Sequence, residues 1–67
     1  MQIYETWEAL KYLSENPKSI FKSKTDRNIG SLSLKFESGV ISIRNKNGAR
    51  FDLDMSTFQI YKWLLEK

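Results

Sequence analysis

Residues 31–55 have the sequence SLSLKFESGVISIRNKNGARFDLDM, in which apolar and polar residues alternate over most of the length. Leu32, Leu34 and Phe36 occupy every second position, and serine, lysine and glutamate fill the positions between them. This spacing is typical of a β-strand with one buried face and one wet face. The first part of the stretch is therefore predicted to be a strand with its leucines on a core.

Two turn signals divide the rest of this stretch. Ser38-Gly39 predicts a tight turn into a β-branched strand over residues 40–44. Asn47-Gly48 tolerates the positive backbone φ angles of a type I′ turn, so it predicts a further hairpin and another strand. The side chains expected on the inner face are Ile41 and Ile43 in the first of these strands and Ala49, Phe51, Leu53 and Met55 in the second.

The beginning of the chain predicts an amphipathic helix. Its apolar residues recur at intervals of four and three, which places on one helical stripe Ile3, Trp7, Leu10 and Leu13. Thr6 is expected to cap the helix, and Trp7 to lie in the core. Pro17 lacks an amide hydrogen and disfavours a helical conformation before it, so the helix should end near Glu15.

Residues 18–24 hold two apolar residues among lysines and serines, which predicts a short strand at an edge of the sheet, guarded by Lys22 and Lys24. Residues 26–30 lack periodicity and predict a loop, with Ile29 turned back against the core.

Residues 56–67 fit two structures. Ser56 and Gln59 have the spacing of a helical capping box, whereas the aromatic and β-branched residues nearby favour a strand. We favour a fifth strand through about Trp63, with the helix as the open alternative.

These elements predict a single α+β domain over residues 1–67, with one N-terminal amphipathic helix packed on an antiparallel meander sheet of four or five strands. A chain of 67 residues buries only about 60% of its unfolded surface on folding. One small core is therefore expected, which makes a second domain or a deep cofactor site improbable.

The composition also limits the chemistry, because the chain contains no His and no Cys. It lacks the usual general base near neutral pH, the thiolate nucleophile and the commonest metal ligand. We therefore predict no enzyme activity, no catalytic residue, no cofactor and no metal site. No apolar run approaches the length of a membrane span, and Glu5 and Glu8 interrupt the beginning of the chain, so a cytoplasmic protein without membrane contact is expected.

Charge is unevenly distributed along the chain. The net charge is +3, and the basic residues concentrate in the middle, at Lys18, Lys22, Lys24, Arg27, Lys35, Arg44, Lys46 and Arg50, against Asp26 and Glu37. If the strands form, Lys35, Arg44 and Arg50 share the outer face with Ser31, Ser33 and Ser42. This face has three interpretations: a solvated surface, a contact for an acidic protein, or a contact for nucleic-acid phosphates.

Asp52 and Asp54 would lie on one face of the last predicted strand, a spacing compatible with acid/base chemistry or a hard cation. We favour cross-strand ion pairs with Arg44 and Arg50 instead.

Aromatic residues gather at the two ends of the chain, at Tyr4, Trp7, Tyr12, Tyr61 and Trp63. So small a fold cannot bury all of them, and tyrosine and tryptophan are enriched at binding hot spots. They fit either simple packing or a partly exposed patch, including the seam of a homodimer. The candidate binding residues among them are Tyr12, Tyr61 and Trp63.

Two segments carry a resemblance to known proteins: residues 7–13, WEALKYL, followed by the break at Pro17, and residues 58–62, FQIYK. The chain resembles small bacteriophage and prophage proteins that begin with an EALKxL helix and continue as a β meander, among them the second Thoeris anti-defence family. It is shorter and lacks the basic, tryptophan-containing segment after the first helix, so no ligand-binding residue carries over. The resemblance implies a phage accessory protein that acts by binding, for example as a host-defence antagonist.

We therefore expect a non-catalytic protein that modulates a host macromolecule by stoichiometric binding. Its predicted contacts are the basic sheet face with Lys35, Arg44 and Arg50, together with the aromatic candidates near the termini. A protein partner is favoured, a nucleic-acid partner is the alternative, and a homodimer is a further option.

Overall fold

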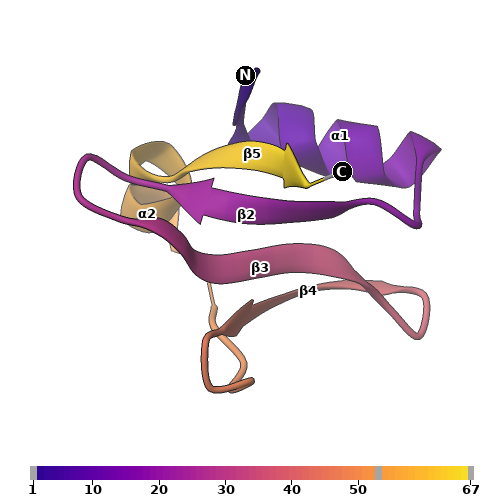
Figure 1. Cartoon of the computed structure of the whole chain (residues 1–67). Coiled ribbons are helices and arrows are strands. Elements are labelled where there is room, and N and C mark those ends of the chain that lie inside the picture. The colour runs from indigo at the N-terminus through magenta and orange to yellow at the C-terminus, as the bar shows by residue number, and fades with distance from the viewer. Residues whose placement is uncertain (1, 53, 67) are drawn as a thin grey trace.

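In the computed structural model, which describes residues 2–52 and 54–66, five antiparallel strands form one sheet in the order β1-β5-β2-β3-β4 (Figure 1). The strands are β1 (Ile3–Glu5), β2 (Ile20–Lys24), β3 (Ile29–Glu37), β4 (Val40–Asn45) and β5 (Lys62–Glu66), and the helices are α1 (Thr6–Glu15) and α2 (Met55–Ile60). The predicted α+β class, with an N-terminal helix on an antiparallel sheet, is confirmed. Strands β2, β3 and β4 follow one another as a meander, whereas β5 crosses back to lie between β1 and β2.

Helix α1 begins after Glu5, whose backbone amide donates a hydrogen bond of 2.9 Å to Oε1 of Glu8. This is half of a capping box, so the prediction of Thr6 as the cap is wrong. The helix ends where predicted, because the Asn16 amide donates to the Tyr12 carbonyl at 2.8 Å just before Pro17.

The buried side of α1 matches the predicted stripe only in part, at Leu10 and Leu13. Ala9 and Leu13 are fully buried and Thr6 is 1% exposed, whereas Trp7 is 59% exposed. The placement of Trp7 in the core is therefore wrong. Ile3 belongs to extended β1, so helical spacing does not apply to it. The small side chains at Thr6 and Ala9 let the helix approach the sheet closely.

One side of the sheet carries the core. Ala9 and Leu13 of α1 pack there on a cluster of buried strand residues, namely Phe21, Leu32, Leu34, Ile43 and Trp63. Phe36, Ile41 and Phe51 pack partly buried against the same cluster, as predicted for inner-face positions. The strand alternation therefore fixes which side faces the helix.

Strand β2 forms as predicted but lies between β5 and β3 rather than at an edge. Its lysines therefore do not guard an edge. Residues 29–30, predicted as part of a loop, already belong to β3, and Ile29 is 63% exposed rather than packed on the core. A bulge in the β2–β3 pairing between Lys22 and Lys24 interrupts the regular alternation of buried and exposed side chains at this end of β3.

The two predicted turns differ in outcome. Ser38 and Gly39 have φ angles of 54° and 80°, as a type I′ turn between β3 and β4 requires. At the second turn Gly48, at φ 84°, has a positive angle and Asn47 does not, so the type I′ prediction is wrong there. The side chain of Asn45 orders this turn by accepting hydrogen bonds from the amides of Asn47, at 2.9 Å, and Ala49, at 3.0 Å.

The strand predicted after this turn is reduced to one bridge, Arg44 with Arg50. Met55 begins α2 and is 74% exposed, so it does not point to the core, and Leu53 lies outside the described residues. Both alternatives for the last segment hold in part. Residues 55–60 form a helix, α2, and the favoured strand begins after it, at Lys62. In the described residues no helix has the length and apolar character that crossing a membrane requires.

Candidate functional site

The described part of the chain leaves one face of the sheet without a helix over it. The core side chains point to the side of α1, and both helices lie behind the sheet in Figure 1. Alternate strand positions therefore point to the opposite side. We call this side the open face. It is formed by Ile3, Glu5, Ile20, Lys22, Lys24, Ile29, Ser33, Lys35, Glu37, Val40, Ser42, Arg44, Lys62, Leu64 and Glu66, with Arg50 paired to Arg44.

The open face brings together the three cations singled out in the sequence. Lys35 is paired with Ser42 and Arg44 with Ser33 across β3 and β4, and Arg50 lies opposite Arg44. Ser31 was expected on this face, but its hydroxyl lies 3.1 Å from that of the buried Ser23. That expectation is wrong because the bulge shifts the alternation at this end of β3.

Glu37 is the acidic centre of the β3–β4 part of the open face. It accepts hydrogen bonds from the hydroxyl of Ser42 and, at 2.8 Å, from Nε of Arg44, and Nζ of Lys35 lies 3.8 Å away. The Ser42 hydroxyl and then the Arg44 guanidinium hold the pKa of Glu37 below its ordinary value of 4.5. Glu37 therefore stays ionised and offsets part of the local positive charge.

This lowered pKa predicts a pH-dependent contribution to stability. The carboxylate binds a proton more readily in the unfolded chain, so its contribution is present above pH 4.5 and is lost as the pH falls through the lower folded pKa. In Glu37→Gln, the decrease in melting temperature relative to wild type should be largest at pH 7 and should shrink toward pH 3. Thermal unfolding at both pH values measures it, with the exposed Glu66→Gln as control. A decrease that is equal at both pH values would contradict the assignment.

Two pairs of like charges face each other across neighbouring strands of the open face. Lys24 lies opposite Lys62, and Arg44 opposite Arg50. Directly opposed like charges destabilise a sheet. Glu5 pairs with Lys62 at 2.5 Å and Glu37 with Arg44, which compensates one member of each pair. Among the described residues, Lys24 and Arg50 form no ion pair, so positive charge remains at both ends of the face.

The β1 edge of the open face is apolar. Ile3 is 50% exposed and lies opposite Leu64, which in turn is paired with Lys22. The aliphatic stem of a lysine covers such a neighbour while its ammonium stays in water. Among the described strand residues, the aromatic side chains point to the helix side, so the open face presents aliphatic and cationic groups.

The aromatic candidates are mostly packed. Trp63 is fully buried and donates from Nε1 to the Thr6 hydroxyl at 2.9 Å, so the expectation that it is exposed is wrong. Tyr12 is half-buried, with its ring 5.6 Å from that of Phe21, and Tyr61 is half-buried 6.2 Å from Phe51.

The exposed tryptophan is instead Trp7, which sequence reasoning placed in the core. The signal that was available is the alternative stripe of Thr6, Ala9 and Leu13, which has the same spacing of three and four residues.

In residues 49–52 and 54 the strand that would have aligned Asp52 and Asp54 is not formed, and Arg44 pairs with Glu37. Among the described residues no ion pair joins Asp52 to Arg44 or Arg50, so the predicted cross-strand pairing is wrong for Asp52. No group of three acidic residues capable of holding a metal ion occurs in residues 2–52 and 54–66.

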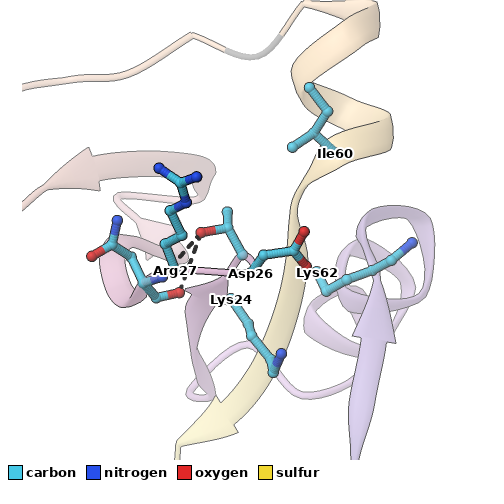
Figure 2. Close-up of a pocket in the computed structure, with 7 residues that line it drawn as sticks. Lys24, Asp26, Arg27, Ile60 and Lys62 are labelled. Atoms are coloured by element: carbon cyan, nitrogen blue, oxygen red, sulfur yellow. Dashed lines mark hydrogen bonds between the residues drawn. The ribbon is translucent and has the colours of Figure 1, made fainter.

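A hollow of about 410 Å³ adjoins the open face where the β2–β3 loop meets the end of α2 (Figure 2). Its lining is Lys24, Thr25, Asp26, Arg27, Asn28, Ile60 and Lys62. Lys24 and Lys62 belong to both the hollow and the open face, so the two surfaces are continuous. Sequence reasoning missed the hollow because only the crossing of β5 to β2 brings residues 60–62 beside residues 24–28.

A scan against models of protein families, a search of curated proteins and a search of solved structures each found no match for this chain. Function is therefore inferred from the residues and their arrangement.

Proposed function

We propose that this chain is a non-catalytic binding protein that docks its open face on an acidic surface of another protein and modulates that protein by stoichiometric binding. The observation that carries the proposal is the charge of the face: six cations, Lys22, Lys24, Lys35, Arg44, Arg50 and Lys62, against the three carboxylates Glu5, Glu37 and Glu66. Complementary charge steers encounter and suppresses wrong partners.

Two features favour a protein partner over nucleic acid. Proteins that bind single strands on a sheet stack bases on exposed aromatic rings, and the described strand aromatics point to the helix side. The exposed Ile3 beside Leu64 provides apolar area that suits a protein surface. A second copy docked face to face would oppose the same excess of cations, which disfavours a homodimer through this face.

The resemblance of the chain to phage accessory proteins supports a role in the cytoplasm of an infected host, where such a protein would occupy a surface of a host-defence component. The absence of His and Cys supports a role without catalysis.

Reversing one cation on the open face is expected to weaken binding far more than reversing one on α1. The probe is poly-L-glutamate at 0.1 M salt. Arg50 is exposed and forms no ion pair within the described residues, so Arg50→Glu should leave folding intact and lower the affinity about tenfold. Lys11→Glu alters the net charge identically on exposed α1, and should lower the affinity less than about twofold, since distant charges are screened.

Circular dichroism checks that both variants fold. Equal losses in the two variants would mean that only net charge matters, which contradicts the proposal. The same titration with single-stranded DNA separates the alternative: affinity for DNA above that for polyglutamate, falling steeply with salt, would identify a nucleic-acid-binding protein instead.

A further inference from the structure

We infer that the hollow beside the open face anchors the acidic partner by taking an apolar side chain that is flanked by carboxylates. This inference rests on the proposed function and deepens it, because it assigns the position and the chemistry of the anchoring contact. The hollow, about 410 Å³, has the size of a small ligand site, for which about 300–1,000 Å³ is typical.

Exposed aliphatic side chains mark this end of the molecule. Ile60 lines the hollow and is 61% exposed, and Ile29, paired with Lys24 in the sheet register, is 63% exposed. Isoleucine is among the residues most often buried in folded proteins. Two exposed isoleucines near Lys24 indicate a surface on which burial of apolar area by a partner would be favourable.

Cations line the hollow together with Ile60. Lys24, Arg27 and Lys62 line the hollow with a single carboxylate, that of Asp26. Among the described residues Lys24 and Arg27 form no ion pair, so their charge is available to a partner.

The side chains of these cations do not converge on one point. In Figure 2 the Lys24 and Lys62 side chains extend in different directions, and the Lys62 ammonium lies 2.5 Å from Oε2 of Glu5. A compact phosphate needs several donors aimed at the same place. Cations spread around an apolar side chain instead suit carboxylates spaced along an extended segment, with an apolar residue between them.

The loop that forms one wall is ordered by its own hydrogen bonds. The Thr25 amide donates to the Asn28 carbonyl at 2.8 Å, and the Asn28 amide donates to the Thr25 hydroxyl at 3.2 Å. A wall that is already ordered loses little conformational entropy on binding. The hollow can therefore supply affinity through apolar burial, while the open face supplies charge attraction.

Two synthetic peptides test this inference. One has a central leucine between two pairs of glutamates, and the other has serine in place of that leucine. Amide chemical shifts of the full chain report binding. The leucine peptide should bind wild type about tenfold more tightly than the serine peptide, with shifts concentrated at residues 24–28 and 60–62.

Ile60→Ser should reduce this preference to about twofold or less. Met55→Ser is the matched control, because Met55 is a 74% exposed apolar residue of the same helix that does not line the hollow. It should keep the full preference.

The inference is overturned if wild type binds both peptides equally, if Ile60→Ser keeps the preference, or if inorganic phosphate shifts residues 24–28 more strongly than the leucine peptide. If the leucine preference is absent while Arg50→Glu still weakens polyglutamate binding, the anchor fails and the proposed function stands. If neither peptide binds and polyglutamate binding is also absent, both fail.

Discussion

Replacing Trp63 with alanine is expected to lower the free energy of unfolding by about 3–5 kcal/mol at 25 °C. Trp63 is the largest fully buried side chain, and it lies in β5 among the core residues that α1 covers. Truncating a buried tryptophan costs about 3–5 kcal/mol. A chain of this length is stable by about 3–10 kcal/mol, so the loss removes much or all of the stability. Urea unfolding followed by circular dichroism measures it.

The other tryptophan provides a matched control. Trp7 is 59% exposed, so Trp7→Ala should lower the free energy of unfolding by less than about 1 kcal/mol. The two variants lose the same side chain and differ only in its surroundings. Equal destabilisation, or greater destabilisation by Trp7→Ala, would contradict the described placement of α1 on the sheet.

Thr6→Val is expected to lower the free energy of unfolding by about 2 kcal/mol and the melting temperature by about 8–16 °C. The Thr6 hydroxyl is buried and accepts the hydrogen bond from Nε1 of Trp63 at 2.9 Å. Its own proton lies within reach of the carbonyl oxygens of Phe58, at 3.0 Å, and Tyr61, at 3.3 Å. Valine has the same shape but leaves the buried indole N–H without its acceptor.

Thr6→Ser separates the hydroxyl from the methyl group. Serine keeps the hydrogen bonds and loses one methyl, so it should remain closer to wild type than Thr6→Val in thermal melts followed by circular dichroism. The reverse order would mean that the methyl contact, rather than the link between α1, α2 and β5, stabilises this junction.

The features predicted correctly depend on neighbouring residues. The alternation of Leu32, Leu34 and Phe36 gave β3 and its inner face, and Pro17 gave the end of α1. The turn at Ser38-Gly39 required only two residues that accept positive φ angles. Each signal lies within a few residues of the feature it predicts, so no knowledge of distant contacts was needed.

The features that sequence reasoning missed depend on distant contacts. The central position of β2 follows from β5 crossing back to it, which no local pattern encodes. Thr6 was predicted as a helix cap because threonine commonly caps, but the arrival of Trp63 in β5 recruits its hydroxyl into the core. Trp7 was predicted to be buried and Trp63 to be exposed, and the structure shows the reverse because β5 inserts between β1 and β2.

In the candidate site, too, the features set by local sequence were predicted and those set by distant contacts were missed. Lys35 and Arg44 were placed together correctly because strand alternation and one hairpin register are local features. The hollow was missed because Lys24 and Ile60 are far apart in sequence and meet only through the sheet. Glu37, the ion-pair partner of Arg44, was missed as well.

The side of the sheet that meets an acidic partner can be observed directly by following backbone amide signals of the wild-type chain during a titration with poly-L-glutamate. We expect the shifts to concentrate at Lys22, Lys35 and Arg44 on the open face, and the exposed positions of α1, such as Lys11 and Ser14, to stay unchanged. Shifts centred on α1, or spread evenly over both sides of the sheet, would contradict a partner-binding open face.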